Sequence, residues 1–476
     1  MSTTHPATRT APAEAPEQPA YRPAPDSFVD RIPGRVGRAA VGAREAVRTR
    51  THWGIGHGLP SVMMRIGARA GDLQAQMVTQ GQDPAQAVDI VERMRAQDPV
   101  LRSGLGWVVT GHAEARAVLT GEDFRSGFPG QGGRLGKIAS WAEPVAFNPV
   151  IAPSLLVTEP PHHTRYRKLV TRVFTMRATE KLRDRTQQIT DELLDDLAAG
   201  GGRPQDVVDA YCAALPVTVI AEILGVPARD RGLILEFGAA AAPSLDLGLG
   251  WRRYRTVQRA LNDFDAWLTD HLDHLRRHPG DNLLSQLVAV TDDGRGLDLR
   301  ELKATAGLVL AAGFETTVNL LGNGIALIAE HPEQRDALLA GTASWANAAE
   351  EVLRFDPPVM LTGRIAARDT EVAGHPVSSG QMVATILLGA NRDPRVFTDP
   401  HTFDVTRENA GAHLTFSAGR HHCLGAALAR MEGEVGLRSI FERYPDLQLA
   451  PGAVRRQTRI LRGYDHLPVV LAPAGR

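Results

Sequence analysis

A single uninterrupted helix, about 30 residues long, is the feature that most limits what this chain can fold into. Its start is marked by Asp298-Leu-Arg-Glu301, in which the two acidic residues are spaced as in a capping box, and the apolar pattern that follows continues to Pro332. At 1.5 Å per residue, such a helix is about 45 to 50 Å long. The chain must therefore build a large domain around it.

Unusual residues occupy the middle of this helix. The sequence Ala-Ala-Gly-Phe-Glu-Thr-Thr over 311–317 places a glycine, an acid and two hydroxyls in an apolar segment, where glycine costs about 1 kcal/mol relative to alanine. One explanation is a planar ligand packed against Gly313, with Glu315 and Thr316 passing protons from solvent to a buried reaction centre. The other is a locally bent helix in which a threonine bonds back to a carbonyl.

A second candidate site is the glycine-rich loop 416–425, which carries Cys423 at the start of the helix that begins near Leu424. The free N–H groups and positive end of a helix lower the pKa of a nearby thiol. A metal ligand or a nucleophile fits this position, and so does a small core residue. Zinc is the poorer metal, because the adjacent His421, His422 and Cys423 cannot readily converge and no second cluster supplies ligands.

A third motif is Glu351-Val-Leu-Arg354, on a helix that Pro357-Pro358 ends. The three-residue spacing puts the carboxylate and the guanidinium on one face, where they can pair. Taken alone, this motif is an ordinary helix salt bridge.

The rest of the chain is predicted to be mainly α with a small β region. Helical spacing recurs over 82–97, 112–119, 163–198, 204–225, 228–240, 251–277 and 424–443, and short strands are expected at 100–102, 107–110, 364–367, 371–373 and 382–388. No linker or repeat divides residues 80–476, so we predict one large domain there. Residues 1–34, rich in Pro, Ala and Thr, are predicted to be a disordered tail. For the arginine-rich residues that begin the segment 35–79, we favour a solvated helical lead-in over a targeting or membrane-surface helix.

Composition excludes several classes of protein. A formal net charge of −1 argues against a nucleic-acid binder with a global basic field. Only two cysteines occur, Cys212 and Cys423, so no disulfide framework is available, and Cys212 is expected in the core. The sequence contains no run of about 18 apolar residues, so it predicts no membrane-spanning helix. The N-terminus also lacks the apolar segment of a secretory signal. We therefore expect a cytoplasmic protein without a membrane span.

Together, the three motifs resemble those of the cytochrome P-450 superfamily, specifically its soluble bacterial members. The loop looks like the family's haem-binding signature, residues 312–317 match its (A/G)Gx(D/E)T(T/S) pattern, and Glu351 with Arg354 matches ExxR. Further pieces follow in family order, at 159–167, at 391–394 with 403–407, and at 462–468. The likeness covers residues from about 80 to 476. Departures are small: Ser417 stands where glycine is frequent, and Glu159 where aspartate is common.

The resemblance implies a single domain of the cytochrome P-450 fold that holds haem b between the long helix and the cysteine loop. Cys423 is then the thiolate ligand of the iron, which favours O–O cleavage. Phe416 packs near the sulfur, and the glycines at Gly419 and Gly425 let the backbone approach the ring. The implied partners of the haem propionates are His163, Arg167, Arg364 and His421.

The resemblance also implies an activity. Glu315 and Thr316 correspond to the acid–alcohol pair that delivers protons during oxygen activation, whereas Glu351, Arg354 and Arg407 form a structural charge triad. The expected reaction inserts one atom of dioxygen into an apolar organic substrate, most simply by hydroxylation. Electrons are expected from a separate ferredoxin and ferredoxin reductase, docking on a basic patch of Arg165, Lys168, Arg420 and Arg430.

The substrate is less constrained. The segments expected to face it are mainly apolar, with Asp246 the one obvious charge, and they lie at 124–157, 244–250, 311–314, 359–362 and 461–464. They favour a hydrophobic terpenoid, steroid, fatty acid or polyketide acted on by a monomeric enzyme. The alternatives are a haem-thiolate enzyme that catalyses epoxidation, desaturation or oxidative coupling in natural-product biosynthesis, and a haem-binding sensor without turnover.

Overall fold

The fold is described from a computed structural model. It describes residues 35–127, 137–138, 141–143, 148–171, 180, 182–199, 203–246, 248–280, 282–290 and 296–471. The predicted tail 1–34 lies outside the described residues. Contacts divide the chain into one unit that ends at Arg48 and a second unit that spans Thr49–Arg476. The second unit therefore includes most of the segment 35–79, which was predicted as a lead-in and is largely helical.

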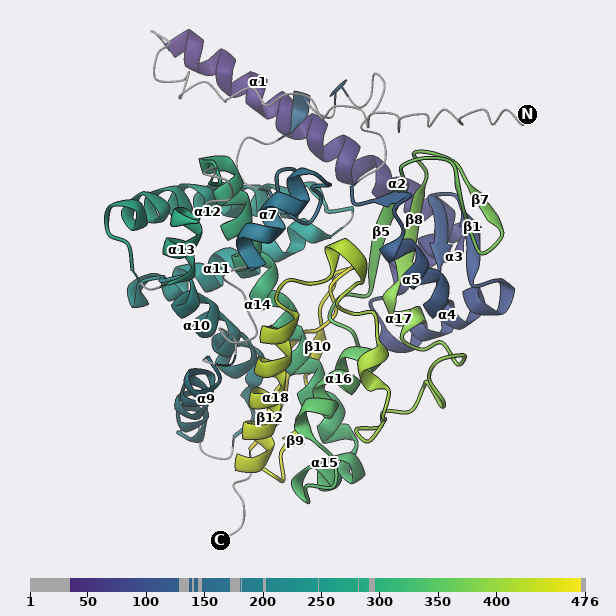
Figure 1. The fold of residues 1–476 in the computed structure, drawn as a ribbon, viewed down its shortest axis with the longest axis vertical. Helices are drawn as coiled ribbons and strands as arrows, with labels where there is room; N and C mark the ends of the chain where they lie inside the picture. The colour runs from purple at the N-terminus through teal and green to yellow at the C-terminus, as the bar shows by residue number, and fades with distance from the viewer. Residues whose placement is uncertain are drawn as a thin grey trace, which may run out of the picture. The chain divides into compact units, whose positions relative to one another are not determined.

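Helices make up most of the chain that the structure describes (Figure 1). The first, α1 (Arg35–Trp53), continues through a π-helical turn (Gly54–Gly58) into α2. The others are α2 (Leu59–Arg69), α3 (Leu73–Gln80), α4 (Pro84–Gln97), α5 (His112–Thr120), α7 (His162–Thr171), α9 (Arg183–Ala198), a π-helix (Val208–Ala213), α10 (Ala214–Ile223), α11 (Arg231–Ala241), α12 (Trp251–Arg277), α13 (Leu283–Ala289), α14 (Leu299–Glu330), α15 (Pro332–Leu339), α16 (Trp345–Phe355), α17 (Leu387–Ala390) and α18 (Ala426–Arg443).

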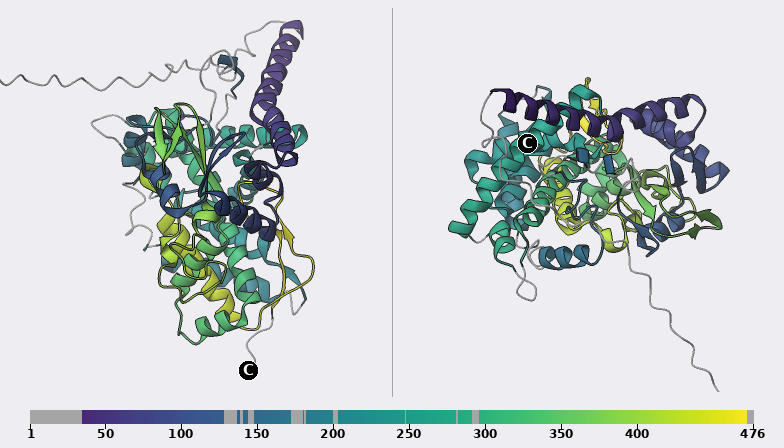
Figure 2. Two further views of the ribbon diagram at one scale, coloured as in Figure 1. Left: turned by 90° about the vertical axis from the view of Figure 1, so that its right-hand side faces the viewer. Right: turned by 90° about the horizontal axis from the view of Figure 1, so that it is seen from above.

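Short strands form four small sheets in the described chain. The largest has the order β1-β2-β8-β5-β3, built from β1 (Val100–Ser103), β2 (Gly106–Val109), β8 (Met382–Ile386), β5 (Leu361–Ala366) and β3 (Phe124–Arg125), and only β2 and β8 are parallel neighbours. The others are β4 (Gln205–Asp206) with β12 (Pro468–Val470) and β9 (Gln448–Leu449), β6 (Thr370–Val372) with β7 (His375–Val377), and β10 (Val454–Arg455) with β11 (Tyr464–His466). Figures 1 and 2 show the large sheet on the side of α3–α5, with α9–α13 on the other side of α14.

The long helix α14 begins where its capping box predicts. The Asp298 carboxylate accepts a hydrogen bond from the Glu301 N–H at 2.8 Å, and the Glu301 carboxylate accepts one from the Asp298 N–H at 3.0 Å. The helix runs for 32 residues and contacts α10, α11, α12, α16 and α18. Among the described helices it alone is long and apolar enough to cross a membrane, and most of that apolar stretch is buried inside the protein. It is the core helix that the sequence analysis predicted.

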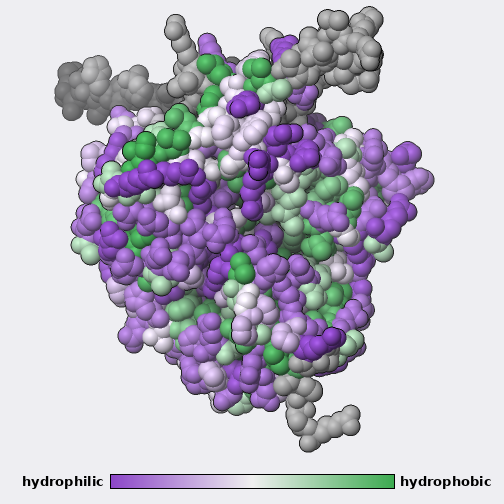
Figure 3. Space-filling model, turned by 180° about the vertical axis from the view of Figure 1, so that it is seen from behind, coloured by the Kyte–Doolittle hydropathy of each residue, from purple (hydrophilic) through white to green (hydrophobic). Residues whose placement is uncertain are grey.

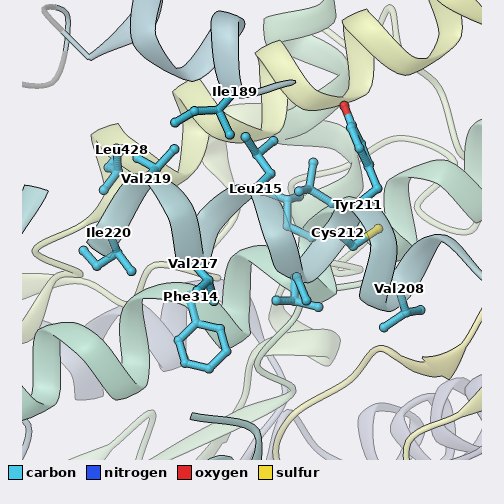
Figure 4. Close-up of a cluster of buried hydrophobic side chains, with 14 of the residues drawn as sticks. Ile189, Val208, Tyr211, Cys212, Leu215, Val217, Val219, Ile220, Phe314 and Leu428 are labelled. Carbon is cyan, nitrogen blue, oxygen red and sulfur yellow. The ribbon is translucent and has the colours of Figure 1, made fainter. Parts of the chain in front are cut away.

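Close packing joins α14 to α18. A β-carbon placed on Gly324 of α14 would lie 2.7 Å from a methyl group of Leu437 on α18, so the Leu437 side chain occupies the space that an alanine would need. The core around them includes Ile220, Phe314 and Leu428, and it holds Cys212 as predicted (Figure 4). This contact fixes the distance between the long helix and the helix that follows the cysteine loop.

One titratable group is buried at this interface. Glu432 of α18 is 2% exposed, and its Oε1 has no hydrogen-bond partner in the structure. Burial raises the pKa of Glu432 to about 8, and a contact with Thr317 of α14 offsets this only in part. The side chain is therefore held mainly as the neutral acid near neutral pH.

A buried charge triad anchors the chain that leads to the cysteine loop. Glu351 and Arg354 are 0% exposed, and their side chains form two hydrogen bonds of 2.6 and 2.7 Å. Arg407 is paired with the same carboxylate at 3.2 Å. The arginines donate further hydrogen bonds to the carbonyls of residues 391, 398, 399, 400 and 402. The predicted triad is therefore present, and it fastens residues 391–407 to α16.

Glu351→Gln is expected to lower the free energy of unfolding by about 3–5 kcal/mol, because two buried guanidinium groups lose their counter-charge. Urea denaturation followed by circular dichroism measures this. Asp89→Asn is the matched control, since its carboxylate is 67% exposed and pairs with Arg93 at 3.5 Å, and it should change stability by less than about 0.5 kcal/mol. Equal effects of the two variants would contradict the anchoring role.

Candidate functional site

The loop before α18 is shaped by backbone positions that favour glycine. Gly419 has a φ of +69°, and a β-carbon there would lie 2.8 Å from the carbonyl oxygen of Leu119, so no other residue fits. Ser417 has a φ of +61°, which costs a non-glycine residue about 1 kcal/mol. The unusual serine noted in the sequence therefore occupies a strained position that glycine would relieve.

Cys423 lies at the end of this loop, just before Gly425, the residue that caps α18. Its N–H donates to the carbonyl of Phe416 at 2.8 Å, which closes the loop. The side chain is exposed, yet nearby protein atoms are numerous enough that burial raises the pKa of the thiol, and Gly425, Arg167 and Arg430 offset this only in part. The sequence predicted a lowered thiol pKa, and that prediction was wrong because desolvation outweighs the helix end. A cation at the sulfur would reverse the balance and favour the thiolate.

Two carboxylates hold the loop from either side. Glu159 accepts hydrogen bonds from His421 at 3.0 Å and Arg420 at 3.2 Å. Burial opposes ionisation of Glu159, but these partners and the Ser126 N–H lower its pKa overall. On the other side, Glu350 pairs with His413 at 2.8 Å.

Glu350 also accepts a hydrogen bond from Arg430 at 2.5 Å, and the guanidinium of Arg430 lies over the ring of Phe416, 4.5 Å from its centre. Phe416 is thus fixed beside the cysteine. The sequence analysis assigned no role to Glu159 or Glu350, and their only local signals were the motif at 159–167 and the acid that precedes Glu351.

Basic side chains gather next to the loop. His163 and Arg167, four residues apart on α7, line a pocket of about 520 Å³ together with Lys168 and Arg420. The rings of His163 and His421 are 4.6 Å apart. The structure therefore brings together the residues expected to bind an anion, although they come from distant parts of the chain.

Two members of this cluster are buried without a matching carboxylate. The Nε2 atom of His163 is buried and has no hydrogen-bond partner in the structure, and burial, with the charges of His421 and Arg167, lowers its pKa to about 4. Arg364 of β5 is 5% exposed and donates to the Gly363 carbonyl and to the Ser417 hydroxyl. Burial lowers its pKa to about 10. Such groups fit an anionic ligand that supplies the missing acceptors.

The middle of α14 provides an open face and a polar pair. Gly313 is exposed, and a β-carbon there would meet only a methyl group of Ile220, 3.9 Å away. Glu315 is buried and forms an ion pair with Arg456, whose Nε donates to the Tyr464 carbonyl at 3.0 Å. Thr316 is half-buried.

Of the two explanations for this segment, the structure shows one part of the second, a threonine that bonds back to a carbonyl. The Thr317 hydroxyl does bond back to the Gly313 carbonyl at 3.2 Å. That bond does not explain why a glycine is needed at 313, because no neighbouring atom would clash with a β-carbon there. Nothing in the sequence indicated the ion pair between Glu315 and Arg456.

The predicted basic patch is largely neutralised. Arg165 forms an ion pair with Glu301, Arg420 with Glu159 and Arg430 with Glu350. Three of its four cations thus have acidic partners, so the patch carries less net charge than the sequence suggests.

Gly313→Ala is expected to raise the free energy of unfolding of the ligand-free protein by up to about 1 kcal/mol, because alanine favours a helix and nothing blocks its methyl group. Gly324→Ala, on the same helix, is the matched control and should cost about 1–3 kcal/mol by clashing with Leu437. Both are measured by urea denaturation. A loss for Gly313→Ala as large as that for Gly324→Ala would show that Gly313 serves packing.

Comparison with known proteins places this site in a family. The family model for cytochrome P450 matches residues 346–457. A putative cytochrome P450 140 of Mycobacterium tuberculosis is 49% identical over 438 residues, which cover 90% of this chain and 99% of that protein. The 6-deoxyerythronolide B hydroxylase of Saccharopolyspora erythraea is 40% identical over 77% of this chain and 90% of its own length.

Solved structures agree with these relatives. Ligand-free CYP164A2 of Mycobacterium smegmatis aligns with a TM-score of 0.75 and 31% identity, covering 84% of this chain and 99% of that one. The fold predicted from the sequence is therefore confirmed. The chain belongs to the cytochrome P450 family of monooxygenases, whose cofactor is haem b.

Proposed function

We propose that this monooxygenase hydroxylates an apolar organic substrate in the cytoplasm. One atom of dioxygen enters a C–H bond, and the second leaves as water after two electrons and two protons are supplied. The observation that carries the proposal is the exposed Cys423 side chain beside a basic pocket lined by His163 and Arg167. Relatives named as a 6-deoxyerythronolide B hydroxylase and a vitamin D(3) 25-hydroxylase support hydroxylation over the other oxidations.

The residues around the loop fit haem b, an apolar ring with two carboxylates. The cluster that suits the propionates consists of His163, Arg167, Arg364 and His421. Within it, the Nε2 atom of His163 is buried without a hydrogen-bond partner in the structure, and a propionate would supply one. Gly313 and Gly425 present backbone with no side chain in the way, since a β-carbon on Gly425 would meet nothing within 4 Å. These residues would hold the ring.

Cys423 would supply the single sulfur ligand. When bound, haem b provides the redox centre at which dioxygen is reduced. The protein's part is to keep the sulfur in place, through the Cys423 N–H bond to Phe416 and the tight turn at Gly419. Phe416, held by Arg430, would pack beside the sulfur and help to keep the loop in one conformation.

Glu315 and Thr316 would move protons to the reaction centre. The ion pair with Arg456 stabilises the ionised Glu315 carboxylate, and the side chain of Arg456 is 17% exposed, so this pair connects the buried acid to the protein surface. Rotation of the carboxylate between Arg456 and Thr316 would let it accept a proton on one side and release it on the other.

Electrons would come from a separate ferredoxin and its reductase, because no described segment holds a flavin or iron–sulfur module. We place docking on the Cys423 side. With three of the four predicted cations already paired, the attraction depends on exposed edges of these ion pairs, and it should be modest and sensitive to salt.

The substrate would contact apolar segments near α14. Two of the expected segments do adjoin, since Val359 and Leu461 form a β-bridge. Asp246, the one candidate charged anchor, instead accepts a hydrogen bond from the Arg459 N–H at 2.9 Å and is buried. It fixes a loop, which leaves a hydrophobic substrate as the best match.

Reduction with dithionite in the presence of carbon monoxide is expected to give the strongly red-shifted Soret band of thiolate-ligated haem. Cys423→Ala should abolish that band, whereas Cys212→Ala, which removes the core cysteine, should keep it. A wild-type band typical of a neutral ligand, or an unchanged band in Cys423→Ala, would overturn the assignment.

Thr316→Ala and Glu315→Gln are expected to lower the product formed per electron pair consumed, since proton delivery contributes on the order of 100-fold or more to such steps. The measurement uses a ferredoxin, its reductase and a ligand found by its spin-state shift, with hydrogen peroxide counted as the lost fraction. Thr317→Ala, which removes the bond back to Gly313 and the contact with Glu432 but leaves Glu315 and Thr316 in place, is the control. Equal coupling in all three variants would remove the proton role.

A further inference from the structure

The helix α2 exposes an apolar stripe to solvent. Leu59, Val62, Met63 and Ile66 are 60%, 53%, 47% and 61% exposed, and their spacing of three and four residues puts them on one face of the helix. Among the described residues, four of the twelve large hydrophobic side chains that are exposed lie on this one helix of 11 residues. The other eight are scattered over other parts of the chain. Figure 3 shows the molecule from behind, a mostly hydrophilic face broken by smaller hydrophobic areas, several of them near its top.

The opposite face of α2 is already used for packing. Met64 is 2% exposed and belongs to a core cluster with Met77 and Val78 of α3. Gly67 lies so close to α3 that a β-carbon would sit 3.1 Å from the β-carbon of Ala75. The helix is therefore held firmly by its inner side, and rotation cannot bury the stripe without removing Met64 from the core.

The charge around the stripe is positive. Arg65 and Arg69 are exposed on α2, one turn apart along its flank, and neither forms an ion pair within the part of the chain that the structure describes. Residues 49–71 contain no acidic residue at all. An apolar face bordered by unpaired arginines is the pattern of a helix that lies on an anionic lipid surface.

We propose that α2 binds the surface of a membrane that contains anionic phospholipids. The four apolar side chains enter the boundary between headgroups and acyl chains, and Arg65 and Arg69 contact lipid phosphates. With 11 residues, or roughly 16 Å, the helix is too short to span the bilayer. The chain is then a peripheral membrane protein without a membrane span.

A second copy of the chain is a poorer occupant of this surface. A symmetric dimer through α2 would bring Arg65 and Arg69 of both copies together with no acid in residues 49–71 to pair with them. Four side chains on one short helix also fall short of the roughly 800 Å² per partner that a stable interface buries. An anionic bilayer satisfies both the apolar stripe and the charge.

The inner side of α2 touches a loop that the proposed function assigns to the substrate. A β-carbon on Gly248 would lie 3.1 Å from the Met64 side chain and 3.3 Å from that of Ser61. Just before α2, the Trp53 indole donates to the Leu249 carbonyl at 2.8 Å. Membrane binding would thus hold residues 244–250 beside the lipid, where hydrophobic substrates dissolve; this last step rests on the proposed function.

The test is co-sedimentation of the full-length haem-loaded protein with vesicles. Binding is expected to vesicles of phosphatidylcholine mixed with phosphatidylglycerol, to weaken with salt, and to be far weaker with phosphatidylcholine alone. The double variant Val62→Ser/Ile66→Ser and the double variant Arg65→Glu/Arg69→Glu should each lower the partition coefficient by about tenfold or more. Leu233→Ser, at an apolar residue 38% exposed on α11, and Arg93→Glu on α4 are the matched controls and should bind as wild type.

All variants lie on the surface and should keep the carbon monoxide spectrum and the thermal midpoint, so lost binding is separable from lost folding or from failure of the haem assignment. Absence of wild-type binding to anionic vesicles would overturn the proposal, as would equal binding by the α2 variants. A dimer seen by light scattering that only the α2 variants dissociate, without vesicle binding, would assign the stripe to a second copy and also overturn it.

Discussion

One buried carboxylate, that of Glu351, holds together the part of the molecule on which the haem site depends. It pairs with Arg354 and Arg407, and these arginines donate further hydrogen bonds to backbone carbonyls between residues 391 and 402. A stretch without regular secondary structure thereby gains the fixed hydrogen bonds that a sheet would provide. The position of the cysteine loop follows, because Asn391 of this stretch forms hydrogen bonds with Leu414 and Thr415, directly before the loop.

The site itself is built in a different way. Around the loop, cations outnumber carboxylates. Burial lowers the pKa of His163 and of Arg364, and neither forms an ion pair in the part of the chain that the structure describes. The thiol of Cys423 is likewise pushed toward its neutral form. Each of these groups is poorly satisfied by the protein alone, and an iron ion with a dianionic ring satisfies all of them together. The fold thus leaves an excess of positively charged side chains beside the loop, and the negative charge of haem b would balance it.

Local patterns predicted much of this structure. The bounds of α14 follow from the capping box and Pro332, since both act within a few residues of the chain. Strands of two or three residues, such as β4 and β9, have no period to detect, and their existence depends on pairing with β12. The structure brings the residues carried by motifs close together, but the sequence did not predict their partners.

The ion pairs of Glu159 with His421 and of Glu315 with Arg456 join residues more than 100 positions apart. The direction in which the Cys423 pKa shifts also depends on distant segments, because burial among them raises it. The nearby sequence does not predict these ion pairs or this pKa shift, because both arise only when distant segments pack together.

The buried acid Glu432, between α14 and α18, has a thermodynamic consequence. Its pKa is raised to about 8 in the folded protein from its ordinary value of 4.5, so between these two pH values the native state binds a proton that the unfolded chain releases. Folding is then coupled to proton uptake, and the contribution of this group to stability declines as the pH rises through that window. The stability of the packing between α14 and α18 is therefore linked to the proton concentration of the medium.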